Sequence, residues 1–200
     1  MSLNDITHET RRLIRKLKLK NSDFTIVSSN CVGGTIYKDL GLVYKSPFVG
    51  LFITPIHFVH LCENFEHFMK LELEEVVDSR LNYPLGRIDS VVIHFMHYET
   101  FQQAQNSWRS RRDRINYENL YFVLVERDGC SIEDLTKFDS LGVSHKISLT
   151  KEPYKGLRHS YHIKNFEDKD ELGNLLDFEN RFSGKRLMYA FNFIKWLNDT

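Results

Sequence analysis

Continuous apolar runs mark the predicted strands of this 200-residue chain. They are rich in Val, Ile, Phe and Tyr and cover residues 24–28, 91–95, 120–125 and 146–149, with a further apolar run at 49–53 and a short candidate strand at 161–163. Such runs are typical of strands that are buried on both faces, as in a largely parallel sheet.

Helical spacing of apolar residues separates these runs. It predicts helices at 55–69, 100–114 and 131–138 and a last helix that carries Leu187, Phe191, Ile194 and Leu197. Thr54 and Pro55 have the residue types of an N-cap and a first helical position, and Ser131 with Asp134 forms a capping-box pattern. Strands that alternate with helices predict a three-layer α/β/α sandwich with a largely parallel or mixed central sheet, Rossmann-like in organisation. The length suits a single domain over residues 1–200.

Two of the apolar runs end in polar elbows that contain glycine. The first run leads into Ser29–Gly34, a turn-rich segment covers Cys31 to Pro47, and the 120–125 run leads into Glu126–Cys130. In open α/β sheets, ligands bind outside the carboxyl ends of the strands. The two elbows are therefore the predicted site.

The first elbow supplies candidate substrate-binding residues. Glycines let backbone amides approach a ligand closely, and successive free N–H groups can hold an anion. The alternative for the glycines is a tight turn with positive φ. The candidates are Asn30, Cys31, Gly33, Gly34, Tyr37 and Asp39.

The second elbow supplies the candidate catalytic groups. Arg127 can hold a phosphate, and Asp128 can act as a base or bind a divalent cation. Cys130 opens a helix, where the helix dipole favours a thiolate, although a small packing residue is the commoner role of such a cysteine. His97, just past the 91–95 run, is a candidate general base. No metal site is assigned.

Charge is balanced overall but not locally. Lys plus Arg and Asp plus Glu number 27 each, so no general field attracts nucleic acid. Residues 1–20 hold six basic and two acidic side chains, with Leu13, Ile14 and Leu17 among them. The favoured interpretation is a solvated basic helix that covers one side of the sheet. Weak peripheral contact with an anionic membrane is the alternative.

Cysteine content and hydropathy indicate the compartment. Three cysteines at wide spacing indicate a reducing environment rather than a disulfide framework. The chain has no apolar run of 18 residues that would span a bilayer, and no apolar stretch follows the basic start as in a secretory signal. We therefore expect a cytoplasmic protein without a transmembrane segment.

Several motifs together resemble one bacterial family. They are Asn30-Cys31-x-Gly33-Gly34-x-Ile36-Tyr37-x-Asp39, Tyr83-Pro84-x-Gly86-Arg87, Ile93-His94-Phe95-x-His97-Tyr98, Trp108-x-x-Arg111-x-x-Arg114, Arg127-Asp128-Gly129-Cys130 and Ser183-Gly184-Lys185-Arg186. Over roughly residues 24–198 the chain resembles a family of unknown function whose members carry the label exopolysaccharide biosynthesis protein, related by name to N-acetylglucosaminyl transferases. The resemblance implies an α/β/α fold and a role in surface-polysaccharide assembly.

These observations predict an enzyme that acts on a sugar phosphate, a nucleotide sugar or a glycan by glycosyl transfer. The Asn30–Gly34 amides and Arg127 would hold anionic oxygen, and Asp128 or His97 would activate the acceptor hydroxyl. The residues do not identify a cofactor, and a divalent cation bound at Asp128 is one candidate. Two alternatives stay open: acyl transfer through Cys130 with His97 as base, and a non-catalytic glycan- or partner-binding module.

Overall fold

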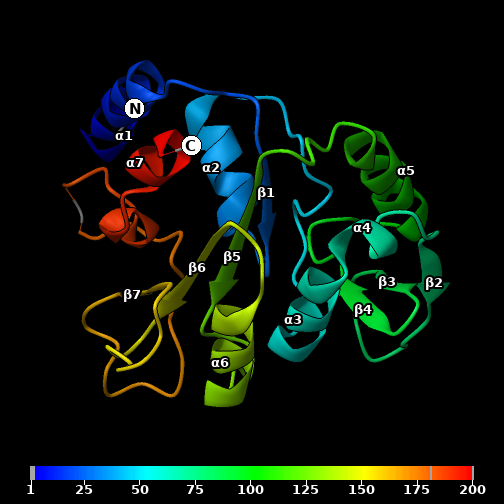
Figure 1. The fold of residues 1–200 in the computed structure, drawn as a ribbon. Coiled ribbons are helices and arrows are strands. Elements are labelled where there is room, and N and C mark those ends of the chain that lie inside the picture. Colours follow the sequence, from blue (N-terminus) through cyan, green and yellow to red (C-terminus); the bar gives the residue numbers. More distant parts are fainter. Residues whose placement is uncertain (1–2, 181, 200) are drawn as a thin grey trace.

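A four-stranded parallel sheet organises the fold (Figure 1). The structure, a computed structural model, describes residues 3–180 and 182–199. The strands lie in the order β1-β5-β6-β7, and every neighbouring pair is parallel. Their bounds are Thr25–Ser28 for β1, Leu120–Val125 for β5, His145–Thr150 for β6 and Ser160–His162 for β7. The predicted α/β class is confirmed.

Alternate side chains of these strands enter two hydrophobic clusters. On β1, Ile26 packs into one cluster and Val27 into the other, and Tyr121 and Phe122 of β5 divide in the same way. Helix α2 (Val32–Leu40) and the last helix, α7 (Phe193–Asn198), belong to the Ile26 side, whereas α3 (Pro55–Glu63) and α6 (Ile132–Ser140) belong to the Val27 side. The sheet is therefore the middle of three layers.

The chain between α3 and β5 forms a smaller unit that packs on the Val27 side of the main sheet. It contains a three-stranded antiparallel sheet, with α4 and α5 beside it (Figure 1). The bounds are Phe65–Phe68 for α4, Glu74–Val76 for β2, Leu85–Ile88 for β3, Val91–His94 for β4 and Phe101–Arg112 for α5. The apolar run at 91–95 thus belongs to a separate sheet. The run at 49–53 forms only an isolated bridge, from Phe52 to His94.

The segment after β1 is a helix and not the predicted turn-rich elbow. Gly33 and Gly34 lie within α2 and neither has a positive φ. A Cβ on Gly33 would lie 2.9 Å from Ser28 Cβ, and one on Gly34 would lie 3.1 Å from Val49 Cγ1. The two glycines therefore let α2 pack closely on β1 and on the segment at Val49.

The helix ends fit the sequence signals in part. The capping box of α6 is complete, because Ser131 Oγ accepts from the Asp134 N–H and the Asp134 carboxylate accepts from the Ser131 N–H. Pro55 does begin α3, but Thr54 makes no side-chain cap bond. The predicted last helix is divided into a 3₁₀ turn at Leu187–Ala190 and α7.

The first helix, α1 (Leu3–Lys18), does not cover the sheet as expected. It packs on α2 through polar side chains: Arg12 donates to the carbonyls of Lys38 and Asp39, and His8 lies 3.5 Å from the Asp39 carboxylate. Leu13 and Leu17 are 62% and 85% exposed. In the described part of the chain, no helix has the length and apolar character needed to cross a bilayer.

Candidate functional site

A cavity of about 350 Å³ lies at the carboxyl ends of β1 and β5. We call it the carboxyl-end cavity. Five segments line it: the end of β1 with the start of α2, the 49–53 segment, the loop after β4, the end of β5, and a stretch of the C-terminal region. The lining residues are Asn30, Cys31, Val32, Phe52, Met96, His97, Val125, Arg127, Asp128 and Gly173–Leu176. The structure thus brings Asn30, His97 and Asp128 around one cavity, as the sequence predicted.

Asn30 and Cys31 reach the cavity because β1 ends at Ser28, shortly before them. Asn30 Oδ1 accepts from the Val32 N–H at 3.2 Å, which orients the side chain at the start of α2. Cys31 is the N-cap residue, and its thiol lies 3.8 Å from the Leu51 carbonyl. Burial raises the pKa of Cys31, and the Asp128 charge raises it further. The thiol therefore stays protonated, and it lines the cavity as a neutral group.

The Arg127-Asp128 elbow has a constrained backbone. Asp128 has φ +59° and Gly129 φ +82°, and a positive φ is uncommon for a residue with a side chain. The Asp128 N–H donates to Glu171 Oε2 at 2.7 Å. Arg127 Nε lies 3.6 Å from Asp128 Oδ1 and 3.7 Å from Glu171 Oε1. A backbone held in a sparsely populated region is a feature that clusters at functional sites.

The environment of the Asp128 carboxyl makes it more basic than an ordinary aspartate. Partial burial raises its pKa and the neighbouring Glu171 carboxylate acts in the same direction, while Arg127 opposes both. The net shift is upward. Because α6 already has its own capping box, Asp128 is not required as the cap of that helix. A carboxylate with these properties can accept a proton from a hydroxyl in the cavity.

His97 follows a strand of the small antiparallel sheet and not a strand of the main sheet. It follows β4, and its N–H donates to the Gly50 carbonyl at 3.3 Å. That bond joins the loop after β4 to the 49–53 segment, which is itself tied to the end of β1 by the Ile53 N–H to Ser29 carbonyl bond of 2.9 Å. Two backbone hydrogen bonds therefore hold the exposed His97 at the rim of the cavity.

The C-terminal wall of the cavity was not predicted from the sequence. Gly173–Leu176 line it, and the Leu172 N–H donates to the Glu126 carbonyl at 2.9 Å, which anchors this stretch to the end of β5. Glu171 is also new, since it accepts from the Asp128 N–H. The stretch has neither helical nor strand periodicity. Its only sequence signal is the turn-forming pair Gly173-Asn174.

Four predicted binding residues lie elsewhere. Gly33 and Gly34 are buried within α2 as packing positions. Tyr37 is fully buried: its hydroxyl donates to the Phe24 carbonyl at 2.8 Å and accepts from the Ile26 N–H, so it fastens α2 to β1. Asp39 is buried beneath α1, where it accepts from the Tyr189 hydroxyl at 2.9 Å. None of the four is among the residues that line the carboxyl-end cavity.

Cys130 is not among the lining residues either. Its partly buried side chain packs against the hydrophobic cluster on the α3 and α6 side. Burial raises the pKa of Cys130 to about 12, and the carboxylates of Asp134, Glu126 and Asp128 add to that rise. The expected effect of the helix dipole is therefore outweighed, and at neutral pH Cys130 is a thiol rather than a thiolate nucleophile.

Clustered metal ligands are not found in the described parts of the chain: no group of three His, Cys, Asp or Glu side chains is placed to hold an ion. His60 and Glu63, which share a helix face, form an exposed pair at 3.5 Å. Asp128 lines the carboxyl-end cavity, and Glu171 lies next to Asp128, from whose N–H it accepts. Mg²⁺ is commonly held by one or two carboxylates together with substrate phosphates, so a cation that enters with its substrate stays a prediction.

Comparison with known proteins assigns a family but no activity. The family model described as "Domain of unknown function (DUF1919)" matches residues 3–198. A protein of Haemophilus influenzae (strain ATCC 51907 / DSM 11121 / KW20 / Rd) that carries the name "Uncharacterized protein" is 34% identical over 181 residues, which are 90% of this chain and 87% of that protein. Membership of a family of unknown function is thereby confirmed. Neither description mentions exopolysaccharide.

Proposed function

The chain belongs to the DUF1919 family, and we propose that it is an enzyme that transfers a glycosyl group from a phosphorylated sugar to a hydroxyl acceptor in surface-polysaccharide synthesis. The observation that carries this proposal is the convergence of Arg127, Asp128, His97 and Asn30 on the carboxyl-end cavity.

The shape and lining of this cavity favour a small polar ligand. Its volume of about 350 Å³ lies at the lower end of the range for small-molecule sites and suits a sugar phosphate. Phe52 and Met96 offer apolar surface to the carbon face of a sugar ring. Asn30 and Arg127 offer donors for hydroxyl and phosphate oxygens, and a guanidinium binds phosphate with two parallel hydrogen bonds.

The charges of the lining side chains favour a distinct catalytic role for each of them. Asp128, with its raised pKa, accepts the proton of the acceptor hydroxyl as the acceptor oxygen bonds to the anomeric carbon. The bond from that carbon to the phosphate oxygen breaks, and the phosphate leaves with the electron pair. Arg127 stabilises the charge that develops on the phosphate. His97 at the rim is placed to donate to the acceptor or the departing phosphate.

The same geometry disfavours acyl transfer through Cys130. That mechanism needs a thiolate beside an imidazole, whereas Cys130 has a pKa of about 12 and lies outside the lining of the cavity that contains His97. A non-catalytic binding module would bind the same ligand in this cavity. It differs from the enzyme in that Asp128 would have no role in converting the bound ligand.

A thermal-shift screen tests the proposal directly. Sugar 1-phosphates and nucleotide sugars are compared with the free sugars, with and without Mg²⁺ or Mn²⁺. A ligand at a hundred times its dissociation constant adds about 2.7 kcal/mol to the free energy of unfolding, which appears as a rise in melting temperature. We expect stabilisation by phosphorylated sugars and loss of that stabilisation in Arg127→Ala. If no phosphorylated sugar raises the melting temperature, the proposal is wrong.

Asp128→Asn separates the enzyme from a binding module. The variant should still be stabilised by the ligand found in the screen but should lose turnover by about a hundredfold or more, the usual contribution of a general base. Asp89→Asn is the matched control, because Asp89 also has a positive φ, of 50°, and lies in the β3–β4 hairpin outside the cavity. Equal turnover in wild type and Asp128→Asn would exclude the base role.

A further inference from the structure

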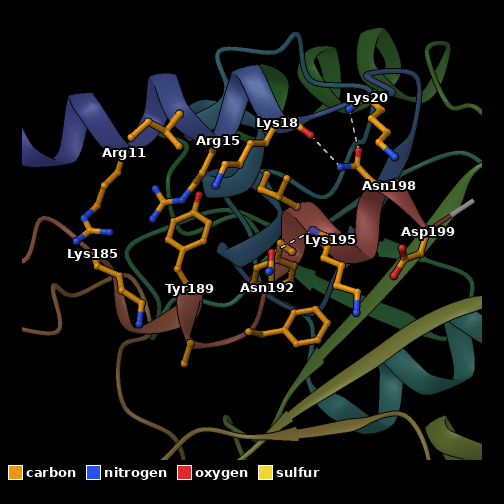
Figure 2. Close-up of a pocket in the computed structure, with 15 residues that line it drawn as sticks. Arg11, Arg15, Lys18, Lys20, Lys185, Tyr189, Asn192, Lys195, Asn198 and Asp199 are labelled. Atoms are coloured by element: carbon orange, nitrogen blue, oxygen red, sulfur yellow. Dashed lines mark hydrogen bonds between the residues drawn. The ribbon is translucent and has the colours of Figure 1, made fainter.

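A second cavity, of about 580 Å³, lies between α1 and the C-terminal segment. We call it the basic cavity. Figure 2 shows basic side chains of α1 on one side and those of the C-terminal segment on the other. Asn198 connects the two, since it donates to the Lys18 carbonyl at 2.9 Å and accepts from the Lys20 N–H at 2.8 Å. The charged residues that line the cavity are Arg11, Arg15, Lys18, Lys20, Lys185, Lys195 and Asp199.

Most of this positive charge is not neutralised by the fold. Within the described residues, no ion pair joins Lys18, Lys20 or Lys195 to a carboxylate. Arg15 is stacked on the Tyr189 ring at 3.4 Å, and its Nη1 is buried without a hydrogen-bond acceptor among the described residues. Six cations against one carboxylate, with an unsatisfied guanidinium nitrogen, form a site that attracts an anionic group.

An exposed apolar stripe runs along α1, the helix that forms one wall of the basic cavity. Ile6, Leu13 and Leu17 recur at i, i+7 and i+11 and therefore share one helix face, and they are 47%, 62% and 85% exposed. The opposite face carries His8 and Arg15, which contact the fold at Asp39 and Tyr189. This helix therefore turns its apolar side chains away from the protein, the reverse of a surface helix that packs on a core.

Ile14 joins the stripe to the cavity, because it lines the cavity and is 46% exposed. A second apolar group lies near the same rim. Phe182, 66% exposed, precedes Ser183, whose carbonyl accepts from Arg11 Nε at 2.8 Å. Apolar side chains and lysines thus border one another on the same surface.

We propose that this surface docks on an anionic membrane, with the α1 stripe in the interfacial region and the phosphate of an anionic lipid headgroup in the basic cavity. The positive charge of the basic cavity favours binding of a phosphate group. The exposed apolar stripe favours a lipid, rather than a soluble anion, as the molecule that carries this phosphate. Lys20 precedes β1 and Asn30 follows it, so the docking surface and the carboxyl-end cavity lie at different ends of the sheet. The proposal does not depend on the function proposed for the carboxyl-end cavity.

Vesicle co-sedimentation of the full chain tests this proposal. We expect binding to phosphatidylcholine vesicles that contain phosphatidylglycerol, little binding to pure phosphatidylcholine, and loss of binding as salt is raised. Lys18→Ala, Lys20→Ala and Lys195→Ala together should weaken binding about a hundredfold, at about fivefold for each lysine. Leu13→Ser with Leu17→Ser should weaken it about tenfold or more. Leu17→Trp should strengthen it, since tryptophan favours the membrane interface.

Matched controls come from other surfaces of the chain. Lys155→Ala with Lys164→Ala removes exposed lysines outside the basic cavity, and Ile56→Ser with Val77→Ser removes apolar side chains that are 65% and 86% exposed. Both control pairs should bind vesicles as the wild type does. Melting curves of all variants check that the fold is intact, which is expected because the altered side chains lie on the surface.

Four outcomes would overturn the proposal. They are equal binding to neutral and anionic vesicles; no vesicle binding at all; loss of binding in the control pairs as large as in the test variants; and stabilisation by soluble pyrophosphate without vesicle binding, which would assign the cavity to a soluble anion. Size-exclusion chromatography adds a fifth: a dimer that Leu13→Ser with Leu17→Ser converts to a monomer would make the stripe an interface between copies of the chain.

Discussion

The carboxyl-end cavity and the basic cavity differ in how the chain builds them. The first is lined by residues that follow strands, by charges of both signs and by apolar side chains. The second is lined by a helix and a C-terminal segment, with a strong excess of positive charge. Strand ends place side chains in a shared, rigid frame, which suits chemistry on a small molecule. A helix with an exposed apolar face suits contact with a large surface.

Helix α2 connects the two regions, and this makes their difference testable. Its first turn borders the carboxyl-end cavity at Val32, while its last turn presents the Lys38 and Asp39 carbonyls to Arg12 of α1. Changes at one end of α2 should therefore be felt mainly in one cavity.

Gly33→Ala should disturb the carboxyl-end cavity most. The new Cβ would lie 2.9 Å from Ser28 Cβ and 3.1 Å from Ile26 Cγ2, so α2 must move away from β1 at its first turn. Overpacking of this kind costs about 1–3 kcal/mol, which denaturant titration measures. Gly142→Ala is the control, because no atom lies within 4 Å of its added Cβ. Loss of vesicle binding together with loss of ligand binding would show that the two cavities are not separable.

Tyr189→Phe tests the structural role of Asp39 beside the basic cavity. The variant keeps the ring beneath Arg15 but removes the hydroxyl that donates to the buried Asp39 carboxylate at 2.9 Å. We expect a loss of about 1–2 kcal/mol in the free energy of unfolding, since a buried acceptor loses one donor. Tyr161→Phe, at an exposed position, should cost nothing. Unchanged stability in Tyr189→Phe would show that this hydrogen bond does not stabilise the fold.

Stability against pH should reveal Asp128 without any substrate. Because partial burial and Glu171 raise its pKa in the folded state, ionisation of Asp128 destabilises the fold as pH rises from the unfolded value near 3.8 through the folded one. Asp128→Asn should therefore melt at a higher temperature than the wild type at pH 7, and the difference should shrink towards pH 3. A variant that melts lower than wild type at pH 7 would assign Asp128 a structural contact.

Thiol labelling should distinguish Cys31 from the other two cysteines. Cys62 is 2% exposed, and burial raises its pKa well above the ordinary value. Burial together with nearby carboxylates raises the pKa of Cys130 to about 12. Cys31 is half-buried and lines the carboxyl-end cavity, so it should react first, and a ligand in that cavity should protect it. Preferential labelling of Cys62, or no protection of Cys31 by a bound ligand, would contradict this assignment.

Local patterns predicted most elements, and five of the ten predicted site residues line the carboxyl-end cavity. The runs that became β1, β5 and β6 and the capping box at Ser131 depend on residues close in sequence, so the chain shows them directly. Asn30, Cys31, Arg127 and Asp128 were found because they follow strands of one parallel sheet. His97 was also found, although by a different route than expected, since its strand belongs to the small antiparallel sheet.

Long-range packing decided the remainder. Two neighbouring glycines fit a turn and a helix equally well in sequence, and the close packing of Gly33 on Ser28 and of Gly34 on Val49 exists only in the folded chain. The spacing of Leu13 and Leu17 fits a buried or an exposed stripe equally well. Arg12 binds the carbonyls of α2, and in this orientation of α1 the two leucines are exposed. The periodicity of side chains is a property of the local backbone and can be seen in sequence. Which surfaces meet depends on contacts such as that between Lys18 and Asn198, 180 residues apart, which only the folded chain creates.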